Sequence, residues 1–244
     1  MQNQQFWLAS PLGTYLTTQE QALYDQAVSN VFGFNAVQLG MLELDLLQQC
    51  RMPFSFRAGV RQGAVNCQST QLPFVSASID LLLLPHVLEF SDDPHQTLRE
   101  AERVLVPEGH IILSGFNPIS AWGAKWALSR ANEYPWHGHF LSLLRIKDWL
   151  ALLGFEIVSL PMCCHALPFS NPAWLRRTRF IERLGQRWWP MMGGAYFIVA
   201  RKKVLGMRVI RPDWKTNRLK RLVSVPTQRQ PTQNKHRNHA CKKK

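Results

Sequence analysis

The chain has 244 residues, of which 46% are hydrophobic and 18% charged, and its formal net charge is +13. This length suits one domain with a large core, and the apolar content excludes disorder throughout. The longest clearly apolar run, residues 79–84, is too short to span a membrane, and residues 1–10 lack a secretory signal pattern. The five cysteines include an adjacent pair. They suit a reducing compartment, so we expect a cytoplasmic protein.

The positive charge is concentrated at one end of the chain. From Arg201 onward there are 15 Lys and Arg residues and one acidic residue, which leaves 14 basic and 15 acidic side chains in residues 1–200. We expect a domain over residues 1–210 and a disordered basic tail over residues 215–244, because the tail has few apolar residues to bury. Such a tail is typical of weak contact with nucleic acid or an anionic surface, and solubility is the alternative.

Short apolar runs predict the strands and periodic apolar residues predict the helices. The first helix is expected soon after Thr17 and Thr18, and the next is capped by Asp92 or Asp93. Two further helices are expected, over residues 119–130 and over residues 145–153. Seven strands are expected, at residues 36–39, 54–58, 63–67, 79–84, 109–114, 155–160 and 195–200.

This alternation of strands and helices predicts an α/β fold with a mostly parallel sheet and helices on both of its faces. In such sheets ligands bind at the carboxyl ends of the strands. The positions to search for a site therefore follow the predicted strands, just after Leu39, Ala58, Cys67, Leu84 and Ser114.

Two stretches carry a family resemblance. LPFVSASIDLLLLPHVLEF at residues 72–90 and LREAERVLVPEGHIILSGFNP at residues 98–118 resemble the class I S-adenosylmethionine-dependent methyltransferases of the small-molecule, type 11 kind. The resemblance implies a Rossmann-like fold with a mostly parallel seven-stranded sheet that ends in an antiparallel hairpin. It also implies S-adenosylmethionine as cofactor and a small-molecule methyl acceptor, for which the aromatic insertion described below favours an apolar molecule.

The cofactor motif is degenerate. Where the family has Gly-x-Gly-x-Gly, this chain has Gly40–Met41–Leu42–Glu43–Leu44, and Leu42 and Leu44 are expected to crowd the cofactor. No acidic residue follows strand 54–58 to bind the ribose, so Glu43 or Asp45, from the first turn, is the proposed substitute. The resemblance places cofactor contacts at Gly40, Met41, Glu43, Gln68, Pro85 and His86.

Two polar residues are candidates for catalysis. His86 follows the fourth strand and would serve as a general base, or it is a histidine that hydrogen-bonds the backbone. Asn117 follows the fifth strand and would hold the substrate beside Trp122, or it caps the next helix.

Two other segments were considered. The histidines and cysteines near His137, His139 and Cys163 lack the spacing of a zinc site, so no metal is predicted, and both histidines are expected near the mouth of the pocket. An insertion over residues 162–192 places Trp174 and Trp188 on one helical face. This helix would form a lid over an apolar substrate, lie on an anionic membrane surface, or pack on the sheet.

Two functions from different classes remain at this point. The first is a methyltransferase with an atypical cofactor pocket. The second is a binding or regulatory protein that kept the fold and lost the chemistry, because a fold alone does not imply a function.

Overall fold

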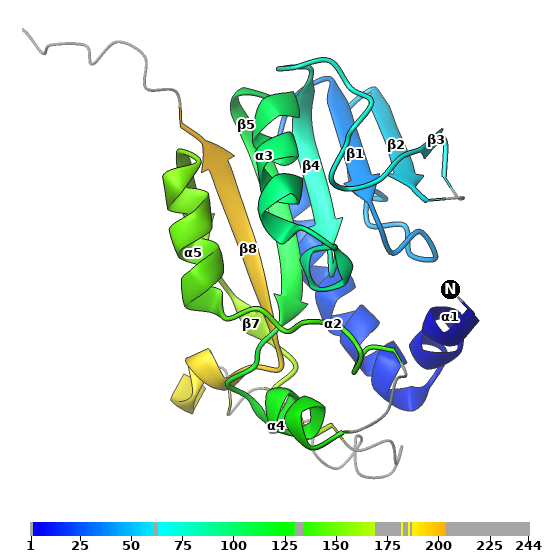
Figure 1. The fold of residues 1–244 in the computed structure, drawn as a ribbon, viewed down its shortest axis with the longest axis vertical. Helices are drawn as coiled ribbons and strands as arrows, with labels where there is room; N and C mark the ends of the chain where they lie inside the picture. Colours follow the sequence, from blue (N-terminus) through cyan, green and yellow to red (C-terminus); the bar gives the residue numbers. More distant parts are fainter. Residues whose placement is uncertain are drawn as a thin grey trace, which may run out of the picture. The chain divides into compact units, whose positions relative to one another are not determined.

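The computed structural model describes residues 2–60, 63–129, 134–168, 182, 185 and 187–203. Its centre is a sheet of eight strands in the order β3-β2-β1-β4-β5-β8-β6, with β7 beside β8 (Figure 1). The five neighbouring strands β3, β2, β1, β4 and β5 are parallel to one another, and β8 is antiparallel to β5, β6 and β7. The strands are β1 (Asn35–Leu39), β2 (Phe54–Gly59), β3 (Val65–Asn66), β4 (Ile79–Pro85), β5 (Leu105–Phe116), β6 (Phe155–Ser159), β7 (Met162–Cys163) and β8 (Ala195–Lys202).

The sheet confirms the predicted fold class and all seven predicted strands. The expected count of seven is one too low, because β7 forms an additional short strand. Met162 and Cys163 pair with Tyr196 and Ala195 of β8, directly after the chain leaves β6. Two residues are too few to show a periodic pattern, so no sequence pattern indicates this strand.

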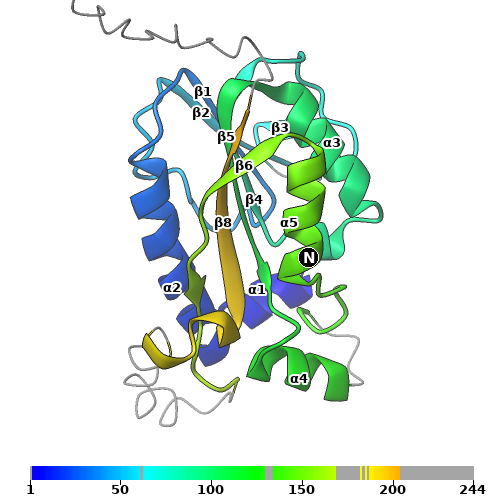
Figure 2. The same cartoon turned by 90° about the vertical axis from the view of Figure 1, so that its left-hand side faces the viewer.

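Helices cover both faces of the sheet. Figure 2 shows α2 on one side of the sheet and α3 and α5 on the other. Tyr24 and Val28 of α2 pack on the first face, and Leu98 of α3 and Ile146 of α5 pack on the second. The helices are α1 (Gln2–Leu8), α2 (Pro11–Val28), α3 (Pro94–Val104), α4 (Ala121–Leu128) and α5 (Leu143–Leu152), with the short 3-10 turns η1 (Leu88–Phe90) and η2 (Pro190–Met192).

The helix that was expected after Thr17 begins six residues before that threonine. The Ser10 side chain caps α2 by accepting a hydrogen bond from the Gly13 amide at 3.1 Å, and Pro11 occupies the first turn. Thr18 therefore lies within α2 rather than at its start, and its hydroxyl donates to the carbonyl of Thr14. A second helix, α1, precedes α2 and was not predicted.

A charged clamp joins α3 to the loop that precedes β4. The Arg103 guanidinium donates to the carbonyls of Leu72 and Phe74, both at 2.9 Å, and pairs with Glu100 at 2.8 Å. Glu100 in turn accepts from the Leu72 amide at 3.0 Å. The hydrogen bonds from Arg103 lower the pKa of Glu100. The clamp fixes the chain between β3 and β4, and so helps to set the cavity edge near Ser69.

Residues Met1–Gly206 form one compact unit. The predicted tail at residues 215–244 lies outside the described residues, as does most of the helix expected in the 162–192 insertion. The partner and lid hypotheses for these segments therefore stay predictions. None of the helices described is both long enough and apolar enough to cross a membrane.

Replacing Arg103 with Met should lower the free energy of unfolding by about 2 kcal/mol, because charge-assisted hydrogen bonds to two carbonyls are lost. Urea unfolding followed by circular dichroism measures this change. Arg201→Met is the matched control, since Arg201 forms exposed ion pairs with Glu108 and Glu156. Its expected cost is about 0.5 kcal/mol. If the two variants lost the same free energy of unfolding, this would contradict the stabilising role of the Arg103 hydrogen bonds.

Candidate functional site

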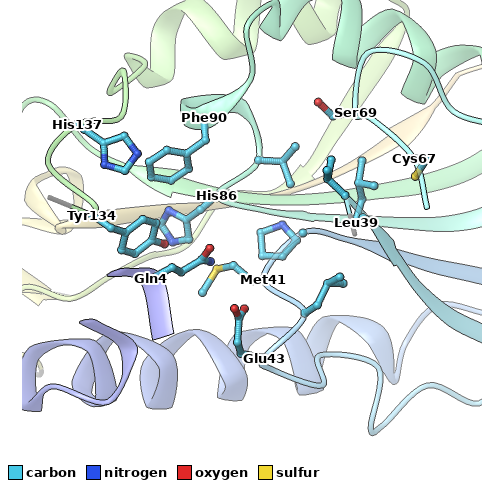
Figure 3. Close-up of a pocket in the computed structure, with 16 residues that line it drawn as sticks. Gln4, Leu39, Met41, Glu43, Cys67, Ser69, His86, Phe90, Tyr134 and His137 are labelled. Atoms are coloured by element: carbon cyan, nitrogen blue, oxygen red, sulfur yellow. The ribbon is translucent and has the colours of Figure 1, made fainter. Parts of the chain in front are cut away.

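A cavity of about 720 Å³ lies at the carboxyl ends of the parallel strands (Figure 3). Leu39 and Gly40 reach it from β1, Gly59 from β2, Cys67 from the end of β3, and Pro85 from β4. This is the edge where the sequence predicted a ligand site, and the volume lies in the usual range for small-molecule sites.

Gly40 is the one position of the degenerate motif that must be glycine. Its φ is +84°, and a Cβ atom here would lie 2.8 Å from Cγ2 of Val87. A larger residue at position 40 would therefore strain the backbone and displace the chain after β4. A single glycine therefore provides the close backbone approach that the family achieves with three.

Gln38 holds the turn that follows β1, and sequence reasoning missed it. This side chain is fully buried, and its amide nitrogen donates to the carbonyls of Gly40, Met41 and Leu44 at 2.9–3.2 Å. Its oxygen accepts from the Leu46 amide at 3.0 Å. These four bonds fix the backbone of residues 40–46, so the turn is rigid without further glycines.

The two leucines of the motif point in different directions. Leu42 lines the cavity, whereas Leu44 packs against the apolar cluster between α2 and the sheet. The predicted crowding is therefore wrong for Leu44, and the cavity stays open. Glu43 lies on the cavity wall as proposed, and Figure 3 shows its carboxylate pointing toward the Met41 side chain.

Gln68 is the one predicted cofactor contact that does not line the cavity. Its neighbours Cys67 and Ser69 line it instead, and the Gln68 side chain is exposed. Gln68 and Gln71 form an isolated bridge that turns the backbone at this point. The chain therefore presents Cys67 and Ser69 where the resemblance placed Gln68.

His86 sits between two buried carboxyl groups. Its Nδ1 lies 2.8 Å from Glu89 of η1, and its Nε2 lies 2.9 Å from Glu20 of α2. All three side chains are at most 2% exposed. Glu89 also accepts a hydrogen bond from the Phe116 amide at the end of β5. We call Glu20, His86 and Glu89 the buried triad.

The triad changes the role expected of His86. Burial by itself lowers the pKa of His86, but the charges of Glu20 and Glu89 and their hydrogen bonds outweigh burial and raise this pKa well above its ordinary value. The imidazolium then donates through both nitrogens and has no lone pair with which to accept a proton. The general-base role is therefore not supported, and His86 is a positioning residue.

Asn117 is also fully engaged. Its amide nitrogen donates to the carbonyls of Gly193 and Met191 at 3.0 and 3.1 Å, and its oxygen accepts from the Ile119 amide at 3.0 Å. Neither Asn117 nor Trp122 lines the cavity, and the Trp122 indole donates to the Ala166 carbonyl. The geometry favours the alternative in which Asn117 holds the backbone, and does not support a substrate role for either residue.

Aromatic residues form one end of the cavity. Phe90, Tyr134 and His137, here called the aromatic wall, all line it, and Gln4 of α1 lies beside them (Figure 3). The Phe90 and Tyr134 rings stack with centroids 5.0 Å apart. His137 confirms the expectation of a histidine near the pocket mouth, whereas His139 is not among the lining residues. No signal in the sequence singled out Tyr134 or Phe90.

No group of three His, Cys, Asp or Glu side chains within the described residues is placed to hold a metal ion. The four cysteines in this part of the chain, Cys50, Cys67, Cys163 and Cys164, are all free thiols.

Comparison with known proteins identifies relatives of this chain. A family model described as "Methyltransferase domain" matches residues 24–113. The chain is 32% identical over 181 residues to the uncharacterized protein YafS of Escherichia coli, a match that covers 72% of each chain. It is 30% identical over 96 residues to the malonyl-[acyl-carrier protein] O-methyltransferase of a Methylovorus species, which covers 39% of this chain and 32% of that protein.

A solved structure shares the fold. The chain is similar to an S-adenosylmethionine-dependent methyltransferase from Archaeoglobus fulgidus, with a TM-score of 0.54 and 16% identity. The superposition covers 76% of this chain and 94% of that one. At this identity the similarity shows the architecture, whereas the match to YafS shows a shared family.

Imidazole NMR titration tests the buried triad. We expect His86 to remain protonated at pH values where His110 has already lost its proton, because burial lowers the pKa of His110. Since the folded pKa of His86 is raised, its stabilising effect is complete below the unfolded value of about 6.5 and is lost only as pH rises through the folded pKa.

Glu20→Gln keeps the hydrogen-bonding shape and removes one charge, so it should lower the pKa of His86. His110 is the internal control and should titrate as in the unchanged protein. A His86 resonance that titrates together with His110 in the unchanged protein would contradict the triad.

Proposed function

Because this chain belongs to the class I S-adenosylmethionine-dependent methyltransferases, we propose that its cavity holds this cofactor and transfers the methyl group to a small molecule. The observation that carries the proposal is the cavity at the carboxyl ends of β1, β2 and β4, which is lined in part by Gly40. The cofactor supplies an electrophilic methyl group on a positively charged sulfur.

The residues present fit such a cofactor. Gly40 and Met41 would offer backbone groups to its amino-acid end, and Pro85 would border it from β4. Glu43 is a carboxylate on the cavity wall that would accept hydrogen bonds from hydroxyl or ammonium groups. Gly59 and Val60 border the cavity after β2, where the family has an acid, so the side chain that binds the ribose differs from the family pattern.

The chain's own contribution to catalysis is mainly to bind and align. Leu39, Met41, Leu42, Val60 and Phe90 give the cavity apolar walls that exclude water. No proton acceptor is available at His86, and a methyl transfer to a neutral nucleophile requires none in the transfer step. Proximity and alignment then supply the rate enhancement.

The open cavity also bears on the alternative of a protein that lost its chemistry. Loss of cofactor binding would be favoured by side chains that fill the space above Gly40. Val87 lies close to Gly40, but a cavity of about 720 Å³ remains beside both residues, and Leu44 is turned away. These contacts support the enzyme.

Replacing Gly40 with Ala should weaken S-adenosylhomocysteine binding at least about tenfold, or 1.4 kcal/mol, in calorimetric titration. The added methyl group meets Val87 at a backbone φ of +84° and so displaces the edge of the cavity. Met41, the next residue, would shift together with the backbone of residue 40.

Gly154→Ala is the matched control. Gly154 has a similar φ of +79°, follows α5, and its nearest contact for a Cβ atom is 3.8 Å away. This variant should lose about 1 kcal/mol of stability and keep its affinity for the ligand. Equal affinity for Gly40→Ala and the unchanged protein would overturn the assignment of Gly40. Folded, unchanged protein that binds neither the cofactor nor its product would overturn the proposed function.

A further inference from the structure

We propose that the aromatic end of the cavity takes a flat, nitrogen-containing aromatic ring as the methyl acceptor, one that is neutral before the transfer and positively charged after it. This inference rests on the proposed function and names its substrate class. It is carried by two independent features of the same end of the cavity, which are stacked aromatic rings and an excess of negative charge.

The aromatic wall offers ring faces and edges to a flat ligand. Phe90 stacks on Tyr134, and His137 lies 5.1 Å from Phe90 between ring centroids. Trp7 supports Tyr134 from behind with its ring edge-on at 5.4 Å. Flat aromatic ligands gain from stacked or edge-to-face contact with such rings, and positively charged rings gain further from their electron-rich faces.

The wall is held in place by bonds to its neighbours. The His139 amide donates to the Glu89 carbonyl at 2.9 Å, and the Trp126 indole donates to the Gly138 carbonyl at 3.0 Å. Gly138 itself passes so close to the Phe90 ring that a Cβ atom would lie 2.7 Å away. A rigid aromatic surface loses little conformational freedom when a ligand binds.

The charges next to the wall favour a cation. The buried triad combines two carboxylates with one imidazolium, and Glu43 adds a third carboxylate on the cavity wall. Among the described residues that line the cavity, none is Lys or Arg. Among the described side chains at this end, negative charge therefore exceeds positive charge, which disfavours carboxylate or phosphate groups on the acceptor.

Tyr134 contributes a further polar atom. The side chain is 6% exposed, and within the described part of the chain its hydroxyl oxygen has no hydrogen-bond partner. Burial, followed by the nearby charges of Glu89, Glu20 and Glu43, raises the pKa of this hydroxyl well above its ordinary value, so it stays protonated. It therefore cannot act as a base.

The excess of negative charge also favours the reaction itself. The lone pair of the ring nitrogen forms the new N–C bond while the C–S bond of the methyl donor breaks and its electron pair stays on sulfur. The positive charge thereby moves from sulfur to the ring nitrogen. Fixed carboxylates beside the acceptor stabilise the charge that develops there, and they need no reorganisation during the transfer. A carboxylate acceptor, as in the name of the Methylovorus relative, would lose its charge in this field instead.

Three probes of one shape test the inference in protein saturated with S-adenosylhomocysteine. They are N-methylquinolinium, which is cationic, 1-methylnaphthalene, which is neutral and isosteric with it, and 1-naphthoate, which is anionic. Equilibrium dialysis should show the cation bound most tightly and the anion weakest, with about a tenfold difference or more between these two probes, which differ by two charges in a partly dry cavity.

Variants locate the effect. Glu43→Gln should reduce the ratio of cation to neutral affinity about fivefold, the effect of one partly screened charge. Glu156→Gln removes an exposed carboxylate on β6 and should leave the ratio unchanged. Phe90→Leu should weaken binding of the cation about fivefold through loss of its ring face. Using the ratio for Glu43→Gln cancels any general change in the shape of the cavity.

The outcomes separate the two proposals. If folded protein fails to bind S-adenosylhomocysteine, the proposed function is overturned. If that ligand binds but 1-naphthoate or 1-methylnaphthalene binds as tightly as the cation, the acceptor inference alone is overturned. Methylation of quinoline at nitrogen, detected by mass spectrometry, would support both.

Discussion

The buried triad is the interaction on which the arrangement of the site depends. Glu20 comes from α2, His86 from the end of β4 and Glu89 from η1, and Glu89 also holds the first free amide at the end of β5. Because charges at most 2% exposed are costly unless they are paired, these four segments can close on the core only in one mutual arrangement. That arrangement joins α2 to the ends of β4 and β5 beside the cavity, which His86 lines.

The sheet was predictable because its strands are apolar runs. These runs alternate along the chain with helices that have capping residues. Residues 79–84 form β4 with every residue but Asp80 buried, as expected for a central parallel strand. The start of α2 was missed because Thr17 and Thr18 are also capping residue types, although Ser10–Pro11 is followed by Leu12 and Leu16 at helical spacing. β7 was missed because two residues carry no pattern, and its pairing is set by β8 rather than by local preference.

The site was predictable where it depends on the strand ends and not where it depends on long-range contacts. Gly40, Met41, Glu43, Pro85 and His86 all lie on the cavity wall because they follow predicted strands. The partners of His86 could not be predicted, since Glu20 is 66 residues away and looks like an ordinary helix residue. Gln38 was missed for a similar reason: a polar residue inside a strand reveals its role only when the turn folds back over it.

The two halves of the cavity are built differently, and under the proposed function this would separate binding of the cofactor from choice of the acceptor. The half at Gly40 and Pro85 is formed by strand ends and a turn fixed by Gln38, so its shape follows from the sheet. The half at Phe90 and Tyr134 is formed by side chains on connecting segments, anchored to η1 through the Glu89 carbonyl. Glu89 belongs to both halves, because its carboxylate pairs with His86 while its backbone fixes the aromatic wall. A change in the wall can therefore alter the acceptor without disturbing the sheet, whereas a change in the triad alters both.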